Sequence, residues 1–265
     1  MALFGRDKQE KTKDDAKNKP AAADKAPKKR LIPEDSLPEL TKFFSGMQDP
    51  VELWIFTDPA QNAPYNAFME NLCRELAEVN PKIEPKFFSL ASGEAKTMSV
   101  DFSPTLLLAP NRCHIRYLGA PLGEESRTLI ETIFRLSVGK SGLGQTSREL
   151  LADLEAERHI QIFVNPACPY CPGQVSNAFR CAMERPDLIS ATCVDASQHL
   201  ALAEHYKVGS VPQTVINDSL TELGLMAATL RAKRAASKNS RDRFSARWRW
   251  PSSPAGRNQG RLAAT

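Results

Sequence analysis

Hydrophobic and polar residues along this chain fall into two kinds of segment. Short apolar runs, such as Val51–Phe56 and Ile160–Val164, have the length and the branched and aromatic residues of buried strands. Longer segments, such as Ser126–Val138, repeat their apolar residues at helical spacing. Strands are predicted over 51–56, 83–90, 105–108, 114–118, 160–164, 188–194, after Pro212 and over 221–225, with 114–118 as an edge strand. Helices are predicted from Leu37 to Phe44 and over 65–79, 94–99, 126–138, 147–158, 172–183 and 200–206.

This order of elements occurs twice, and residues repeat with it. Phe56-Thr57-Asp58-Pro59-Ala60 matches Phe163-Val164-Asn165-Pro166-Ala167, and Val100-Asp101-Phe102-Ser103-Pro104 matches Val208-Gly209-Ser210-Val211-Pro212. The spacing between the two matched segments differs by one residue from one copy to the other. A duplicated unit keeps such a spacing. Each copy reads strand–helix–strand–helix–strand–strand–helix, which predicts an α/β fold with mixed sheets flanked by helices.

The second copy carries the chemistry. Cys168-Pro169-Tyr170-Cys171 follows the predicted strand 160–164 and precedes a predicted helix. Backbone N–H groups and the dipole at a helix N-terminus favour a thiolate, so we expect a lowered pKa for Cys168, the attacking nucleophile. Cys171, about one turn inside the helix, would resolve the mixed disulfide. Pro169 suits the first helical turn.

The first copy has Gln61-Asn62-Ala63-Pro64 at the corresponding place. None of these side chains can take part in thiol–disulfide chemistry. We therefore expect the first copy to serve as a support or a docking surface.

Two other uses of the cysteine pair are considered. A zinc site needs a second pair of ligands, and Cys181 and Cys193 neither form a pair nor lie at a suitable spacing from a histidine. A pair of core cysteines is the other alternative, and the position between strand and helix argues against it. We predict no metal site. The remaining cysteines suit core packing.

Charge is distributed unevenly. Residues 1–30 carry a net +5, residues 227–265 carry +9 and the intervening 31–226 carry −10, within a total of +4. The predicted organisation is a disordered basic leader at 1–32, a unit without the cysteine pair at 33–141, a unit with it at 142–226, and a basic tail at 227–265. Arginine and tryptophan alternate in the tail, which could bind nucleic acid. A solvated, disordered tail is the preferred interpretation, so nucleic acid is not an expected partner.

Membrane insertion and secretion are not expected. No apolar run reaches the roughly 18 residues that span a bilayer. The first residues, Met1–Lys8, lack the apolar stretch of a secretory signal. We expect a cytoplasmic location, where a close cysteine pair is more often catalytic than structural.

The cysteine motif together with Gly209-Ser210-Val211-Pro212 resembles the C-terminal unit of the tandem thioredoxin-fold protein disulfide oxidoreductases. The layout also resembles the N-terminal domain of the alkyl hydroperoxide reductase flavoprotein subunit. The resemblance covers about residues 34–226 and implies two tandem thioredoxin-like units with a glutaredoxin-like dithiol. It implies Cys168 and Cys171 as catalytic residues, and Pro169, Tyr170, Val211 and a cis-Pro212 that faces the dithiol as the substrate-binding surface. The backbone at Val211 would pair with the bound partner as a strand does.

Departures from related families narrow the expected function. Ile162 occupies the position where thioredoxins have a buried acid, and the double glycine of glutathione-using glutaredoxins is missing after the proline strand. No Gly-x-Gly-x-x-Gly segment follows a strand, so the chain is expected to hold no cofactor besides its redox-active disulfide. Electrons would come from a flavin-dependent thioredoxin-reductase-like enzyme. Disulfide-containing proteins, among them peroxiredoxins, would be the clients. The competing hypothesis is a non-catalytic scaffold or docking protein with the same fold.

Overall fold

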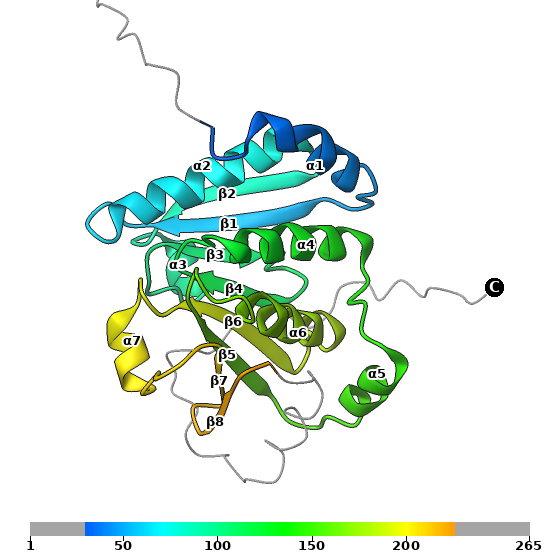
Figure 1. Ribbon diagram of the computed structural model, residues 1–265, viewed down its shortest axis with the longest axis vertical. Helices are drawn as coiled ribbons and strands as arrows, with labels where there is room; N and C mark the ends of the chain where they lie inside the picture. The colour runs from blue at the N-terminus through cyan, green and yellow to red at the C-terminus, as the bar shows by residue number, and fades with distance from the viewer. Residues whose placement is uncertain (1–29, 226–265) are drawn as a thin grey trace, which may run out of the picture.

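The fold is organised around one mixed sheet, seen in a computed structural model that describes residues 30–225. Eight strands in this part of the chain form the sheet in the order β2-β1-β3-β4-β6-β5-β7-β8 (Figure 1). The strands are β1 (Val51–Thr57), β2 (Ile83–Ser89), β3 (Thr105–Leu108), β4 (His114–Leu118), β5 (Arg158–Val164), β6 (Ile189–Asp195), β7 (Gln213–Ile216) and β8 (Leu220–Leu223). Strands β1–β4 form the first unit and β5–β8 the second.

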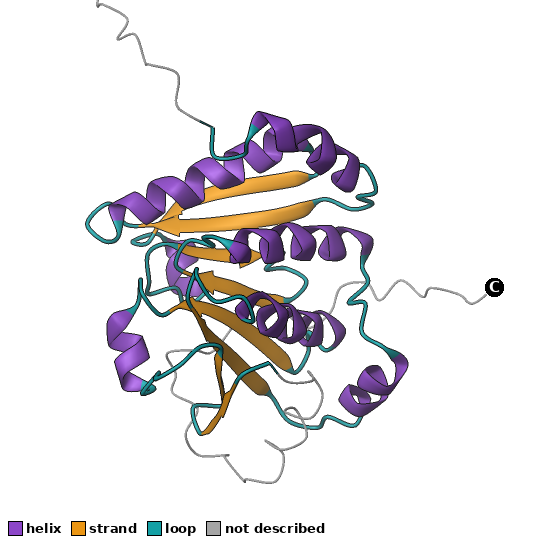
Figure 2. Cartoon of the chain, in the orientation of Figure 1, coloured by secondary structure: helices purple, strands orange, loops and turns teal. Residues whose placement is uncertain are grey.

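Helices lie on both faces of the sheet (Figure 2). They are η1 (Glu34–Ser36), α1 (Leu37–Phe44), α2 (Ala63–Val79), α3 (Gly93–Thr97), α4 (Glu124–Val138), α5 (Gln145–Ala152), α6 (Cys171–Glu184) and α7 (Leu200–His205). Helices α2, α4 and α6 lie side by side across one face. The fold class predicted from the sequence is confirmed, except that the two predicted sheets are joined into one.

The predicted edge strand 114–118 lies in the interior of the sheet. Strand β4 pairs with β3 antiparallel and with β6 of the second unit parallel, which joins the two units. Its charged residue Arg116 is only 3% exposed and contacts the carbonyl oxygens of Met98 and Ser99. A charge within a strand usually marks an edge. Here the Arg116 guanidinium donates hydrogen bonds to two carbonyl oxygens inside the protein, which stabilise its charge. No periodicity in the sequence reveals this arrangement.

One hydrophobic core extends through both units on the side of α2, α4 and α6. It includes Leu53 and Ile133 of the first unit as well as Ile162 and Phe179 of the second. The ring of Tyr117 on β4 packs edge-on against Phe179 on α6, with ring centroids 5.2 Å apart. Because apolar surface from each unit is buried against the other, neither unit has a complete core of its own.

The other elements match the predictions within a few residues, with one larger difference. The predicted helix 147–158 is the shorter α5, which ends at Ala152. Arg185 hydrogen bonds to the carbonyl oxygens of Leu151, Ala152 and Leu154, and so caps the end of α5. This cap comes from a residue distant in sequence. Among the described residues, no helix has the length and hydropathy to cross a membrane.

The predictions for the basic leader up to residue 29 and for the basic tail lie outside the described residues, and the domain boundaries remain predictions.

Candidate functional site

The two units build the same turn after their first strand. In the second unit the N–H of Ala167 donates to Asn165 Oδ1 and the N–H of Cys168 donates to the Asn165 carbonyl, both at 3.0 Å. In the first unit Asp58 accepts the equivalent bonds, from Ala60 at 2.9 Å and from Gln61 at 3.0 Å. Asn and Asp favour this turn because their side chains bond to the backbone two residues ahead. The repeat seen in the sequence therefore reflects a repeated structure.

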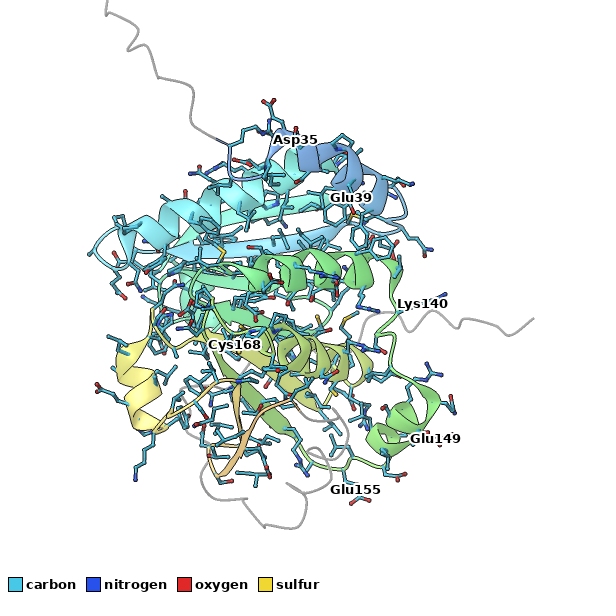
Figure 3. The ribbon with its side chains drawn as sticks, viewed as in Figure 1. Asp35, Glu39, Lys140, Glu149, Glu155 and Cys168 are labelled. Atoms are coloured by element: carbon cyan, nitrogen blue, oxygen red, sulfur yellow. A yellow bond between two sulfur atoms is a disulfide. The ribbon has the colours of Figure 1, made fainter. Side chains whose placement is uncertain are left out.

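Cys168 and Cys171 form a disulfide, with their Cα atoms 5.5 Å apart. Cys168 lies in the turn that follows β5 (Figure 3). Cys171 is the first residue of α6. Cys168 is 8% exposed and Cys171 is fully buried. The sulfur nearer the surface is thus the one available to a partner, and the bond places both sulfurs at the N-terminus of a helix.

The helix predicted over 172–183 is α6, which begins one residue earlier, but the cysteines lie differently from the expectation. Cys168 and Pro169 lie before the helix rather than in its first turn, and Cys171 opens the helix rather than lying one turn inside it. A helix beginning at Cys168 would need the N–H of Pro172 to donate to the Cys168 carbonyl. Proline has no N–H, so the helix begins later, with Pro172 in its first turn.

The Val211–Pro212 peptide bond is cis, as the resemblance implied. Pro212 directly precedes β7, whose first residue, Gln213, pairs with Phe163 near the end of β5. This antiparallel register places the proline at the end of the sheet where the cysteine turn begins. Val211 packs against the core cluster that contains both cysteines. Within the described residues its backbone makes no hydrogen bond, so its polar groups remain available to a bound strand.

The first unit has a second cis-proline bond, Ser103–Pro104, at the matching position. There the space between turn and proline loop is filled by polar side chains. The N–H of Asp58 donates to Ser103 Oγ at 2.7 Å, and that hydroxyl donates to Asn66 Oδ1 at 2.9 Å. Asn66 Nδ2 donates to the carbonyls of Asp58 and Gln61, and Asn62 Nδ2 donates to the Ser103 carbonyl at 2.8 Å. The first unit thus bonds its own proline loop.

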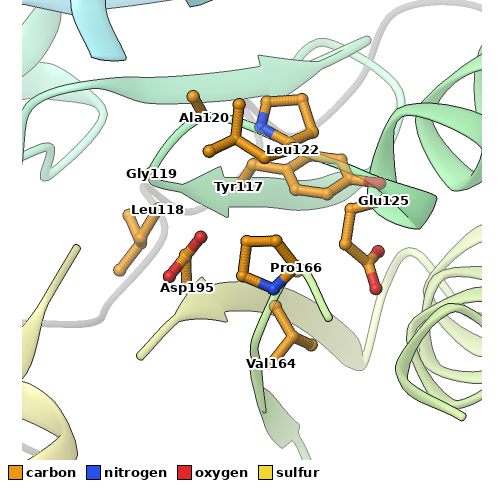
Figure 4. A pocket seen from close by; sticks show the side chains of 11 residues that line it. Tyr117, Leu118, Gly119, Ala120, Leu122, Glu125, Val164, Pro166 and Asp195 are labelled. Atoms are coloured by element: carbon orange, nitrogen blue, oxygen red, sulfur yellow. The ribbon is translucent and has the colours of Figure 1, made fainter. Parts of the chain in front are cut away.

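A small cavity lies beneath the cysteine turn, between the two units (Figure 4). The first unit contributes the end of β4, the connection to α4, and Glu125 on α4, while the second unit contributes Val164, Pro166, Cys193 and Asp195. The space suits about one water molecule. Among the described residues, neither carboxylate oxygen of Glu125 nor the hydroxyl of Tyr117 has a hydrogen-bond partner.

Glu125 is a candidate functional residue that the sequence analysis missed. It is 3% exposed, and burial raises its pKa to about 7, while the Thr128 hydroxyl lowers this pKa and the negative charge of Asp195 raises it by smaller amounts. Two acidic residues, Glu124 and Glu125, begin the helix, and acidic residues there are ordinary partners of the dipole. The sequence contains no signal that one of them lies beside the other unit's cysteine turn.

The surface around the disulfide is uncharged from Asn165 to Pro172 and from Val208 to Gln213. Tyr170 is 65% exposed there. The remaining described cysteines are buried, and burial raises the pKa of Cys73, Cys113 and Cys181 to about 12 and that of Cys193 well above its usual range. No group of three or more potential metal ligands occurs within residues 30–225. Accessible thiol chemistry in this region is therefore confined to Cys168.

Comparison with known proteins agrees with this architecture. Residues 158–233 match the family described as Thioredoxin domain. Over 65 residues the chain is 29% identical to a thioredoxin of Methanocaldococcus jannaschii, which covers 24% of this chain and 76% of that protein.

Two solved structures share the tandem arrangement. A protein disulfide oxidoreductase from Aeropyrum pernix is 29% identical with a TM-score of 0.68, covering 76% of this chain and 91% of the other. The alkylhydroperoxide reductase component AhpF of Enterococcus faecalis is 22% identical with a TM-score of 0.69, covering 77% and 99%. The resemblance stated from the sequence is confirmed, and a disulfide-oxidoreductase-like function is supported.

Proposed function

We propose that this thioredoxin-fold chain is a protein disulfide oxidoreductase that acts through Cys168-Pro169-Tyr170-Cys171. The observation that carries the proposal is the Cys168–Cys171 disulfide at the start of α6, at the end of the sheet where the cis-Pro212 loop lies. The relation to the Aeropyrum pernix oxidoreductase supports the same activity. Cys168 and Cys171 are the proposed catalytic residues.

The proposed reaction starts from the reduced dithiol. The Cys168 thiolate attacks one sulfur of a client disulfide, which forms a mixed disulfide and releases the other client sulfur as a thiol after it takes up a proton. Cys171 then loses its proton and attacks the Cys168 sulfur. The client leaves fully reduced and the Cys168–Cys171 bond is formed. Two electrons and two protons pass to the client, and the reverse direction uses the same steps.

Glu125 is the proposed proton acceptor for Cys171. Cys171 is fully buried, so water cannot readily take its proton. A carboxyl group with a pKa of about 7 is partly ionised at neutral pH and can accept a proton. We assign Glu125 this role because it is a buried carboxyl group that lines the cavity together with Pro166 of the cysteine turn.

The client is proposed to bind as an extended strand across the cis-proline loop. The unbonded backbone of Val211 would supply the strand-like hydrogen bonds, with Pro212 beside it. Pro169 and the exposed ring of Tyr170 would contact apolar residues of the client on either side of its disulfide. The segments 165–172 and 208–213 contain no charged residue that could pair with the carboxylates of glutathione, and this favours proteins as the proposed clients.

The proposed electron donor is a separate flavin-dependent thioredoxin-reductase-like enzyme in the cytoplasm, and peroxiredoxins are among the proposed clients. The structural similarity to AhpF, a component of an alkylhydroperoxide reductase, supports the proposal of this electron donor and of these clients.

Reduction of insulin by dithiothreitol, followed by turbidity, tests the activity. The wild-type chain should accelerate precipitation, and Cys168→Ser should abolish the acceleration because the nucleophile is lost. Cys171→Ser should trap the mixed disulfide, visible by non-reducing electrophoresis. Cys73→Ala, a change in the core of the first unit, is the matched control and should retain the rate. Equal rates for wild type and Cys168→Ser would favour the scaffold hypothesis.

A further inference from the structure

The turn that carries Cys168 contacts the first unit directly. Gly123 ends the connection between β4 and α4 and precedes the first residue of that helix. A methyl group at this position would lie 2.7 Å from the carbonyl oxygen of Pro166. That is closer than van der Waals contact allows, so only glycine permits the observed approach. Pro166 lies between Asn165 and Cys168, inside the turn itself.

The conformation of Gly123 also requires glycine. Its φ of 57° and ψ of −130° fall in a region that residues with a side chain avoid. The neighbouring Leu122 and Pro121 line the cavity on the side of the first unit, opposite Pro166 and Val164. The connection thus forms a surface against which the cysteine turn rests.

The equivalent turns of the two units are held by different means. Ser103 and Asn66 fix the turn of the first unit with side-chain hydrogen bonds. At the matching positions the second unit has Val211 and Gly173, and neither side chain can make those bonds. The cysteine turn lacks this internal support and receives a contact from the other unit instead.

We propose that the first unit sets the redox potential of the dithiol by positioning Cys168 through the Gly123–Pro166 contact. Cys171 is fixed as the first residue of α6, whereas Cys168 moves with the turn. Disulfide formation is favoured when the two sulfurs are held at bonding distance beforehand. Displacing the Pro166 carbonyl loosens that arrangement and favours the dithiol. Gly123 is therefore a positioning residue, and this role builds on the proposed oxidoreductase function.

The test compares Gly123→Ala with Gly139→Ala in the full-length chain. Gly139 ends the same helix, also has a positive φ of 66°, and has open space where a methyl group would lie. Each protein is equilibrated in glutathione buffers of defined ratio and alkylated. The oxidised fraction of the Cys168–Cys171 peptide is then measured by mass spectrometry, which separates it from the four buried cysteines. The pH dependence of Cys168 alkylation is recorded in parallel.

Gly123→Ala should lower the equilibrium constant for disulfide formation about tenfold, a rise in potential of ~30 mV, while Gly139→Ala should stay within about twofold of wild type. If Gly123→Ala yields no folded protein, Leu122→Ala tests the same surface and should lower the constant about threefold. The proposal is overturned if the equilibrium constant of folded Gly123→Ala is unchanged, or if Gly139→Ala changes it equally. Where Gly123→Ala does not fold and Leu122→Ala replaces it, an unchanged constant in Leu122→Ala overturns the proposal.

This measurement is independent of client turnover. If wild type and Cys168→Ser reduce insulin equally, the proposed function fails, yet the potentials still decide whether the first unit controls the couple.

Discussion

The two units share a backbone arrangement, but at the corresponding turn the second unit has the cysteine pair and the first unit has none. Both have a turn capped by Asp58 or Asn165, followed by a helix and later by a cis-proline bond. In the first unit Asn62 donates to the Ser103 carbonyl. The equivalent backbone at Val211 makes no hydrogen bond among the described residues. In the first unit, which lacks the cysteine pair, the backbone that corresponds to Val211 is thus already hydrogen-bonded.

This difference fits the roles proposed for the two units. The first unit holds its turn by internal hydrogen bonds, and under the proposal its loops support the second unit. The connection between β4 and α4 supplies Gly123, and the start of α4 supplies Glu125, to the region beside Pro166 in the cysteine turn. The following experiments, from the largest expected effect to the smallest, test this division.

Moving the dithiol into the first unit should not move the activity. In a Cys168→Ser/Cys171→Ser background, Gln61→Cys and Pro64→Cys place two thiols at the matching positions. Insulin reduction should stay about 100-fold below wild type, because the client strand cannot reach its place beside the thiols.

Adding Ser103→Val and Asn62→Ala should open the groove and recover about tenfold of the lost rate. Full activity in the simple transplant would show that the closed groove is not what silenced the first unit.

Glu125 should make the stability of the chain depend on pH. Its pKa is raised from 4.5 to about 7, so the folded state holds a proton that the unfolded state releases in this interval. Stability is therefore full below about pH 4.5 and decreases as the pH rises through 7, by up to about 3 kcal/mol.

Glu125→Gln removes this titration. Urea unfolding should show the variant gaining stability relative to wild type between pH 4 and pH 8, with the smallest difference at pH 4. Glu124→Gln, at the exposed neighbouring residue, is the control and should keep the wild-type pH dependence. A Glu125→Gln difference that does not vary with pH would contradict the raised pKa.

Removing the Ser103 hydroxyl should destabilise the first unit. Ser103 is 1% exposed, accepts from the N–H of Asp58 and donates to Asn66. Ser103→Ala leaves the half-buried N–H of Asp58 and the buried Oδ1 of Asn66 without this partner, at a cost of about 1–3 kcal/mol in urea unfolding. Ser210→Ala, at an exposed residue of the second unit's proline loop, should change stability by less than about 0.5 kcal/mol. Similar values for the two variants would show that the network does not hold the first unit's turn.

Tyr170 should affect only client binding. Its ring is 65% exposed, so Tyr170→Ala should leave folding unchanged and raise the KM for a protein client about threefold with kcat preserved. Leu200 on α7 is equally exposed at 65% and provides the control. A fall in kcat for Tyr170→Ala, or the same KM change in Leu200→Ala, would exclude a specific contact at the dithiol.

Much of the fold could be predicted from local patterns. The strand 51–56, the helix 126–138 and the repeat of Phe56–Ala60 in Phe163–Ala167 depend on periodicity and on turn-forming residues, which act within a few positions of one another. The position of the cysteine motif between a strand and a helix follows from the same local order.

The rest depends on contacts between distant residues. The segment 114–118 was expected to be an edge strand, but pairing of β4 with β6 places it inside the sheet. In the sequence Gly123 and Glu125 precede the predicted helix 126–138, and only the tertiary structure brings them close to Pro166. The helix 172–183 was predicted to within one residue, whereas Cys171, expected one turn inside the helix, is its first residue.

By itself, the sequence determined that the chain is a duplicated thioredoxin-like protein with one cysteine pair, since motif, spacing and periodicity are local properties. Only the tertiary structure decided that the units share one sheet and one core, that hydrogen bonds join the turn and the proline loop of the first unit, and that this unit supplies a buried carboxyl group beside the second unit's cysteine turn. Burial, pKa and steric contact arise when distant segments exclude water together, so they follow from the packing of the whole molecule.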